Sequence, residues 1–398
     1  MSGYQYYFFL ALVTLMMSVN LFATDIYLPA LPEMAITFGC SQSEIQFSFT
    51  IFLVGLAVCQ LITGGLTDRF GRKTVALLGF SIFTICSLLC AGANSLTELN
   101  VYRLMQAIGG GVGSVIGRAL VADHYNRRES VKIFSTVYPI VGLSAALGPL
   151  IGGYVTAWWD WRANFVLIAF FGLLILLLTG FCLKDKVKSA QSSQMSGRSY
   201  VKVMRNIEFL GYAFIICASF CVFRSYSIES PFVFHKQGYH PEEMGNFYIS
   251  LSLAYLIGNL AAKKLINTMD VSKVLKIGFF FLVLGGAAMM GSTFLVDNNI
   301  YTIVIPMTII TLGNGFLFPV ASAAAMTSVR GELTGTASGI MGAMQFLLAA
   351  FCTIWIGDIC QGDALLMSFF MGGVILLGVF SYFLLVYRNV EIAVDSGE

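Results

Sequence analysis

Charged side chains are scarce in this sequence. Of its 398 residues only 11% are Asp, Glu, Lys or Arg, whereas 57% are apolar; soluble domains average about 25% charged and about 45–50% apolar residues. The 23 basic and 21 acidic residues are too few to keep the surface of a soluble chain of this size wet. The composition therefore excludes a soluble enzyme, a nucleic-acid-binding protein and a disordered protein, and predicts a chain surrounded largely by lipid.

Motifs of enzymes and metal sites are also absent from the sequence. It contains no H-E-x-x-H, phosphate-binding loop, dinucleotide fingerprint or nucleophile elbow. Its three histidines, His124, His235 and His240, lack metal-ligand spacing, and most of its nine cysteines lie inside apolar runs. We therefore expect no enzyme activity, no metal, no cofactor and no disulfide framework. ATP hydrolysis is not expected to drive the protein.

Long apolar runs recur along the whole chain. A helix needs about 20 apolar residues to cross a bilayer core of about 30 Å. Runs of this kind without any Asp, Glu, Lys or Arg are Met1–Thr24, Ile45–Thr67, Thr74–Thr97, Ile133–Trp159, Ala163–Leu183, Met244–Ala262, Ile277–Val296, Asn298–Val329, Leu333–Gly357 and Ala364–Tyr387. Two further spans, at about 98–123 and about 207–234, carry internal charges. The sequence thus predicts an all-α membrane protein with twelve transmembrane helices.

The basic residues predict how these helices are oriented. Eighteen Lys and Arg residues fall in the turns on one side, and only Arg162 and Lys236 fall on the other. Because basic loops stay in the cytoplasm, both termini are predicted to be cytoplasmic. No cation precedes the first apolar run, and Asp25 and Pro29 stand where a cleavage site would be, so this run is not expected to be a cleaved signal.

The chain is predicted to consist of two related halves. A charged, Ser- and Gln-rich segment at 184–206 follows the sixth span and indicates a cytoplasmic linker between a six-helix bundle at 1–183 and another at 207–398. At an offset of 199 residues, Phe38–Ile45 aligns with Gln237–Met244, and Gln60 with Asn259. Transporters built from repeated bundles bind their substrates between the repeats, near the middle of the membrane.

Several motifs resemble those of one transporter family. Residues 64–73 (GGLTDRFGRK) resemble the G-x-L-a-D-r-x-G-r-k signature of the major facilitator superfamily. Residues 99–106 (LNVYRLMQ) are similar to its R-x-x-Q-G motif, with Ala107 in place of the glycine, and 148–153 (GPLIGG) to its antiporter motif. Further segments resemble the drug:proton antiporters of the Bcr/CflA (bicyclomycin/chloramphenicol resistance) branch: 24–32 (TDIYLPALP), 118–123 (RALVAD), 161–165 (WRANF), 230–233 (SPFV) and 335–338 (GTAS).

The resemblance implies a fold and a function. The fold is that of a multi-pass protein of a bacterial inner membrane, with two pseudo-symmetric six-helix bundles. The function is secondary active transport: a proton gradient drives antiport of a small molecule such as a drug or toxic metabolite by rocker-switch alternating access. The expected partners are the substrate, protons and the lipid bilayer, and we expect a monomer.

Three ionisable residues inside spans are candidates for proton coupling. A carboxylate inside a bilayer costs about 2.5–3.5 kcal/mol, so it normally faces a cavity or a partner and marks a functional site. Asp25 lies about two thirds of the way across the first span and Glu229 at similar depth in the seventh. The resemblance implies that Arg103 assists proton transfer. For each residue a purely structural role, as an ion pair or a brace for backbone carbonyls, is the alternative.

Candidates for the substrate cavity are charged or aromatic residues of the spans. Arg224 and Glu229 are five residues apart, about 140° around a helix, so they cannot share one face. Two charged residues inside the seventh span indicate a cavity more polar than that of a pump for lipophilic drugs. The candidate set is Asp25, Tyr27, Arg118, Tyr138, Arg224, Glu229, Phe232 and Phe346.

Two segments are candidates for conformational gating. The resemblance implies that the turn after the second span clamps the halves in the outward-open state, with Arg72 able to pair with Asp123, and that the antiporter motif acts as a hinge. The alternatives are plain positive-inside topology and a close-packing notch. The set is Gly64, Asp68, Arg69, Gly71, Arg72, Lys73, Asp123, Gly148, Pro149, Gly152 and Gly153.

Other functions stay open. The two extra charges, Arg224 and Glu229, suit a dedicated siderophore or metabolite transporter, as an exporter or a proton-coupled importer. A sensor that no longer transports and an intramembrane enzyme are disfavoured, because the gating motifs are present and no catalytic constellation is.

Overall fold

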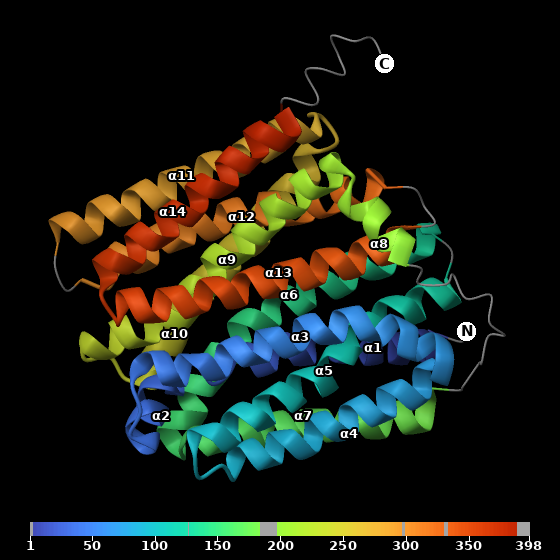
Figure 1. Cartoon of the computed structure of the whole chain (residues 1–398), viewed down its shortest axis with the longest axis horizontal. Coiled ribbons are helices and arrows are strands. Elements are labelled where there is room, and N and C mark those ends of the chain that lie inside the picture. The colour runs from blue at the N-terminus through green and yellow to red at the C-terminus, as the bar shows by residue number, and fades with distance from the viewer. Residues whose placement is uncertain (1–2, 126, 184–196, 297–298, 330–332, 388–398) are drawn as a thin grey trace. The chain divides into compact units, whose positions relative to one another are not determined.

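The computed structural model describes residues 3–125, 127–183, 197–296, 299–329 and 333–387 (Figure 1). All regular elements in these ranges are helices, which confirms the predicted all-α class. Contacts within the chain define two compact units. Unit 1 comprises Met1–Ser193 and His240–Tyr248, and unit 2 comprises Gln194–Tyr239 and Ile249–Glu398. The domain boundaries expected from the sequence stay a prediction.

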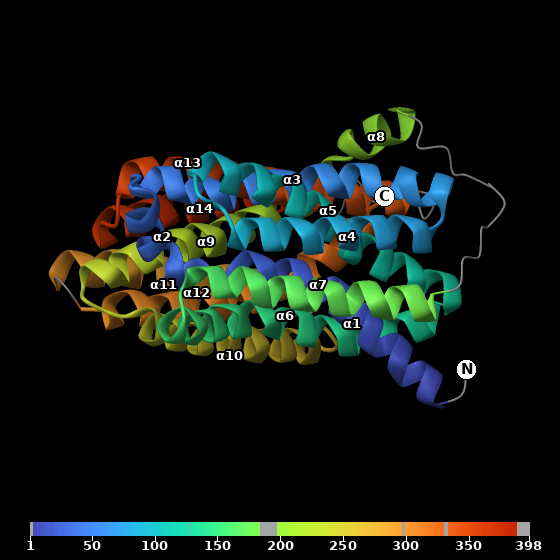
Figure 2. The ribbon, with the colours of Figure 1, turned by 90° about the horizontal axis from the view of Figure 1, so that it is seen from below.

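Unit 1 is built around α5. Its helices are α1 (Gly3–Asp25), η1 (Leu28–Ala30), α2 (Leu31–Phe38), α3 (Gln42–Phe70), α4 (Arg72–Ala91), α5 (Leu96–His124), α6 (Arg127–Trp158) and α7 (Trp161–Cys182). α5 packs against α3, α4 and α1, and α4 also lies beside α7 (Figures 1 and 2). Glycines make these contacts close: a Cβ on Gly109 would lie 2.6 Å from the carbonyl oxygen of Gly79, and one on Gly111 2.6 Å from the sulfur of Cys59.

Unit 2 is built around α9. Its helices are α8 (Gly197–Met204), α9 (Ile207–Lys236), α11 (Val271–Leu295), α12 (Tyr301–Thr327), α13 (Thr334–Cys360), α14 (Ala364–Tyr382) and a terminal π-helical turn, η3 (Phe383–Tyr387). α9 packs against α12, α13 and α14. α10 (Pro241–Leu265) belongs to unit 1 up to Tyr248 and to unit 2 from Ile249 onward.

Polar caps start many of the helices after short connections. Ser41 and Glu44 form a reciprocal capping box at the start of α3. Side chains of Ser95, Asp160 and Asn206 accept backbone N–H groups of α5, α7 and α9. Such caps satisfy donors that a helix start leaves free, so the polar turn residues explain where the apolar helices begin.

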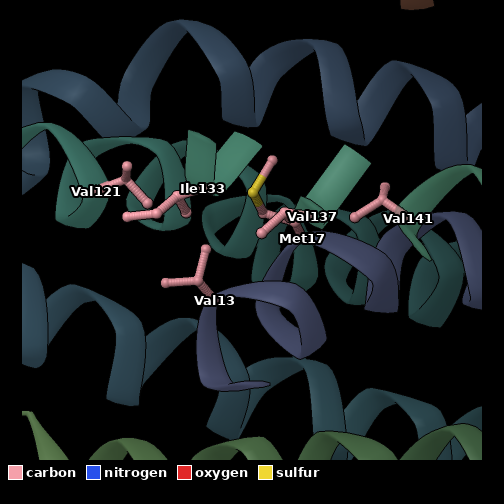
Figure 3. Close-up of a cluster of buried hydrophobic side chains, with 6 residues drawn as sticks. All are labelled: Val13, Met17, Val121, Ile133, Val137 and Val141. Carbon is pink, nitrogen blue, oxygen red and sulfur yellow. The ribbon is translucent and has the colours of Figure 1, made fainter. Parts of the chain in front are cut away.

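A cluster of aliphatic side chains joins three helices of unit 1. Figure 3 shows Val13 and Met17 of α1, Val121 of α5, and Ile133, Val137 and Val141 of α6. All six are buried. Because interhelical attraction inside a bilayer depends on close packing of small and branched side chains, this cluster fixes α1 between α5 and α6.

The outer surfaces of the helices are apolar. Large hydrophobic side chains are exposed along them, for example Leu78, Phe170 and Phe181 in unit 1 and Phe280 and Leu376 in unit 2. Water would disfavour such surfaces, whereas the hydrocarbon core of a bilayer accommodates them. The predicted environment of the chain thus fits the distribution of its side chains.

Eleven helices of the described residues are long and apolar enough to cross a membrane. Twelve spans were expected, and α10, a helix of 25 residues, is the element at the predicted eighth span. It is not among the eleven, and polar residues such as Asn246 and Asn259 interrupt its apolar sequence. The count of twelve and the orientation of the termini therefore stay predictions.

Two local features differ from the sequence-based expectation. The first span does not end at Thr24, because η1 and α2 prolong it to Phe38. Part of the expected linker at 184–206 is helical, since α8 covers Gly197–Met204; residues 184–196 lie outside the described ranges. The described cysteines are free thiols: Cys40, Cys59, Cys86, Cys90, Cys217, Cys221, Cys352 and Cys360.

Candidate functional site

Asp25 lies at a break inside the first membrane span. It is the last residue of α1 and is buried, with 1% of its surface exposed. Helix α1 ends here because Pro29 has no N–H to donate to the carbonyl of Asp25 and its ring disfavours a continuous helix. Pro32 repeats this effect one turn later. The carboxylate therefore lies at the C-terminal end of α1 in mid-span, close to the negative end of the α1 dipole.

The antiporter-type motif on α6 packs directly against this break. A Cβ on Gly148 would lie 3.1 Å from the Cβ of Asp25, and one on Gly152 would overlap the carbonyl oxygen of Ile26. A Cβ on Gly153 would likewise overlap the carbonyl oxygen of Pro241 at the start of α10. A side chain at Gly152 or Gly153 would overlap a backbone carbonyl, and one at Gly148 would crowd Asp25, so the motif lets α6 approach the end of α1 closely.

Arg103 of α5 is fully buried and is surrounded by rings. Its guanidinium carbon lies 3.9 Å from the ring centroid of Phe52, 4.4 Å from that of Tyr27 and 5.7 Å from that of Phe165. Cation–π contacts of this kind stabilise a desolvated guanidinium by about 2 kcal/mol or more. Among the described residues Arg103 forms no ion pair, so aromatic faces take the place of a counter-ion.

Arg103 also braces the end of α1. Its Nη1 donates to the carbonyl of Ala23 (3.2 Å) and to Oε1 of Gln106 (2.7 Å). Nε2 of Gln106 in turn donates to Oγ of Ser87 on α4 (2.7 Å). The arginine thus supplies a donor to a carbonyl at the broken helix end, two residues before Asp25. This is the bracing role considered for Arg103, and it does not exclude the proton-coupling role.

Arg118 lies four turns further along α5 and is half-buried. Its Nη2 donates to Oε1 of Gln60 on α3 (3.1 Å), and Nε2 of Gln60 donates to Oγ of Ser114 (3.0 Å). Because a guanidinium only donates hydrogen bonds, the side-chain amide of Gln60 must turn its oxygen toward Arg118 and its nitrogen toward Ser114. Arg118 is therefore held in place by neutral partners, and its charge stays available.

Unit 2 contains the second group of candidate cavity residues. Arg224 of α9 is buried, with its guanidinium carbon 4.9 Å from the ring centroid of Phe220. Phe220 contacts Phe346 of α13 edge to face at 5.6 Å, so one ring connects two predicted cavity residues. Phe232 is also buried in α9, whereas the side chain of Tyr138 lies outside the described ones. An offset of 199 residues pairs Asp25 with Arg224.

Glu229 is buried near the end of α9 and contacts a turn between two other helices. Its Oε1 accepts the backbone N–H of Gly362 (2.5 Å), and Nζ of Lys236 donates to the carbonyl of Gln361 (2.5 Å). Both turn residues have positive φ, 46° for Gln361 and 74° for Gly362. Glu229 is therefore engaged with the α13–α14 turn.

The turn between α3 and α4 has the geometry expected from its sequence. Gly71 separates the two helices with a φ of 82°, in the region that glycine occupies without strain. Arg72 at the start of α4 forms an ion pair with Asp123 near the end of α5, and both side chains are about one quarter exposed. Of the other members, the side chain of Asp68 lies outside the described ones. The carbonyl of Gly64 accepts a hydrogen bond from the hydroxyl of Thr67. The guanidinium of Arg69 lies over the ring of Phe70, and Lys73 is half-buried.

Several residues of the site were not predicted. Phe52 and Phe165 around Arg103, Gln60 and Ser114 beside Arg118, and Lys236 beyond Glu229 are separated in sequence from the groups they contact. A signal existed for three of them: Gln60 is a polar residue inside an apolar run, Phe165 belongs to the WRANF segment, and Lys236 is one of two cations in the turns predicted to lie outside the cytoplasm. In the described part of the chain no group of three or more His, Cys, Asp or Glu side chains is arranged to hold a metal.

Comparison with known proteins gives one consistent result. The profile of the Major Facilitator Superfamily matches residues 13–353. The chain is 25% identical to a bicyclomycin resistance protein homolog of Haemophilus influenzae over 93% of this chain and 94% of the relative, and 26% identical to multidrug resistance protein D of Escherichia coli over 92% and 94%. An uncharacterized transporter of Rickettsia felis is 30% identical over 84% and 85%.

Solved structures agree on the fold. A D-xylose–proton symporter superposes with a TM-score of 0.78 at 15% identity, over 94% of this chain and 97% of the other. A bacterial homolog of the lysosomal transporter Spinster, inward-facing and occupied, gives 0.77 at 13% identity, over 96% and 97%. With its apolar helices and bacterial relatives, the chain is a multi-pass protein of the inner membrane and a transporter rather than an enzyme. It belongs to the major facilitator superfamily.

Proposed function

We propose that this chain is a proton-coupled exporter of a small molecule such as a drug or a toxic metabolite, working as a twelve-span monomer with both termini in the cytoplasm. One observation carries the proposal: Asp25 is buried at a mid-span helix break, directly against the glycines of an antiporter-type motif. The names of the relatives from Haemophilus influenzae and Escherichia coli support export of drugs.

In the proposed cycle the carboxyl group of Asp25 carries the proton. It takes up a proton from outside, and the loss of its negative charge releases the substrate. The two halves then rock, and the proton leaves to the cytoplasm. The ionised carboxylate favours a new substrate, so one group alternates between two ligands. Arg103 holds the carbonyl of Ala23 and so keeps the end of α1 in position during this exchange.

The remaining candidates have supporting roles in this proposal. Glu229 is the second proton-binding group. Tyr27, Tyr138, Phe232 and Phe346 provide ring surfaces to the substrate, and Arg118 and Arg224 attract its polar or anionic groups. The Arg72–Asp123 pair and the neighbouring turn stabilise the outward-open state, and the motif at Gly148–Gly153 lets α6 shift against α1.

The proposal is tested by replacing Asp25 with Asn in proteoliposomes. With bicyclomycin and chloramphenicol as probes, an imposed pH gradient drives probe movement in the original chain, and Asp25→Asn reduces it to the level of protein-free vesicles. Asn keeps the volume and the hydrogen-bonding capacity but cannot release a proton. Asp270→Asn at the exposed start of α11 is the control and retains full activity. Undiminished pH-driven transport by Asp25→Asn refutes the assignment.

A second candidate is a transporter dedicated to a charged metabolite or siderophore. The buried cation of Arg224 and the half-buried cation of Arg118 favour it. Counterflow with matched charged and neutral compounds separates the two functions, because a dedicated transporter exchanges only the charged class. A ligand-stabilisation screen at about pH 6 and about pH 8 supplies the compounds for that comparison.

A further inference from the structure

One peptide group in unit 2 is held from both ends by charged side chains of α9. The carboxylate of Glu229 accepts the N–H of Gly362, and the ammonium of Lys236 donates to the carbonyl of Gln361. This N–H and this carbonyl belong to the same trans peptide bond, so they point in opposite directions. The peptide therefore lies between the two charges and connects them.

The spacing on α9 suits this arrangement. Glu229 and Lys236 are seven residues apart, which is about two turns, or about 10 Å along one face of the helix. That separation leaves room for a peptide group and the two hydrogen bonds that end on it. A carboxylate accepting from N–H and an ammonium donating to a carbonyl are both charge-assisted bonds, about twice as strong as neutral ones.

The turn itself is shaped for this contact. It joins α13 to α14, and its two central residues have the positive φ values that orient the shared peptide toward α9. A Cβ on Gly362 would lie 3.0 Å from Cε of Lys236. A larger residue at position 362 would therefore crowd the lysine side chain, whereas glycine does not. The carboxylate of Asp363 accepts the N–H of Leu366 (2.9 Å) and caps α14.

We infer that Lys236 is a positioning residue for Glu229, acting through the Gln361–Gly362 peptide. The inference rests on the proposed function in one respect, namely that Glu229 is a proton-binding group. Lys236 fixes the peptide so that its N–H faces the carboxylate. Proton uptake by Glu229 removes the negative charge, weakens the bond to Gly362 and releases the α13–α14 turn from α9. The charged and titratable groups around the site are Lys236 on α9, Cys360 ending α13 and Asp363 preceding α14.

Hydrogen exchange of the full-length purified chain tests the contact directly. Lys236→Met keeps the length of the side chain without its charge, and Lys236→Arg keeps the charge. Lys236→Met should speed exchange of the Gly362 amide by at least about tenfold at about pH 8, and Lys236→Arg should restore protection. Arg162→Met, which removes the other cation on this side of the membrane, is the matched control and leaves this amide unchanged. An unchanged Gly362 amide in Lys236→Met overturns the inference.

The pH profile of transport provides the second readout. Loss of Lys236 should shift the pH dependence of probe movement, while Lys236→Arg and Arg162→Met follow the original profile. If Lys236→Met follows it as well, the role in proton coupling is wrong. If the original chain moves no probe with a pH gradient, the proposed function fails, and the exchange experiment still decides the contact between Lys236, the peptide and Glu229.

Discussion

The central residue of the proposed mechanism is buried where two glycines of α6 meet the end of α1. Asp25 and Ile26 face Gly148 and Gly152 across the α1–α6 contact, so the two helices approach each other closely at this point. A methyl group added at Gly152 must displace the carbonyl of Ile26 rather than a flexible side chain, and a close-packed interior gives way to such a change only at a cost.

Gly152→Ala should destabilise the protein by about 1–3 kcal/mol or more and abolish transport, because its Cβ would overlap the carbonyl oxygen of Ile26. Gly180→Ala on α7 is the control: its Cβ would meet only Leu77 at 3.8 Å, and it should be neutral or stabilise by up to about 1 kcal/mol. Thermal unfolding in detergent compares the two. Equal melting temperatures for both variants would show that α6 can move away from α1 freely.

At the scale of elements, α1 and α9 show how prolines decide whether a span is continuous. An offset of 199 residues pairs Asp25 with Arg224 and Pro32 with Pro231, but Pro29 has no counterpart. Accordingly α1 breaks, whereas α9 runs without interruption from Ile207 to Lys236. A second proline within one turn removes a further hydrogen bond, and this difference separates the two helices.

The link between α4 and α5 leads to a prediction about gating. Arg72→Asp should reduce transport strongly while changing stability by only about 0.2–1 kcal/mol, because the pair with Asp123 is partly exposed. The swapped double variant Arg72→Asp/Asp123→Arg should recover much of the transport rate. Probe efflux and thermal unfolding of the single and double variants measure both effects. A double variant as inactive as the single one would contradict a role for the pair itself.

Sequence reasoning located elements better than contacts. Apolar runs, turn residues and the motifs at 64–73 and 148–153 identified the helices and the family. Asp25 and Arg103 stood out because a charge inside a span is rare. The ring of Phe52 did not, since it is one of 34 phenylalanines, and nothing local distinguishes a ring facing a guanidinium from one facing lipid. The peptide between Glu229 and Lys236 involves backbone atoms, for which side-chain patterns carry no signal.

At the scale of the whole molecule, α10 decides the topology. Eleven crossings would leave the two termini on opposite sides of the membrane, whereas the predicted twelve put both on the same side, which the basic turns predict to be the cytoplasm. A green fluorescent protein fused after residue 398 should therefore fluoresce, since it matures in the cytoplasm, and an alkaline phosphatase fused there should be inactive. Fusions at residue 238 should behave in the opposite way. A dark fluorescent fusion at the C-terminus would indicate that α10 does not cross.

The surroundings of Arg103 have a consequence for the electric field inside unit 1. Its partners are a carbonyl, an amide and three rings, none of which exchanges protons near neutrality. A guanidinium itself keeps its charge at any physiological pH. Arg103 therefore contributes a positive potential beside the end of α1, and none of these partners places a compensating negative charge next to it.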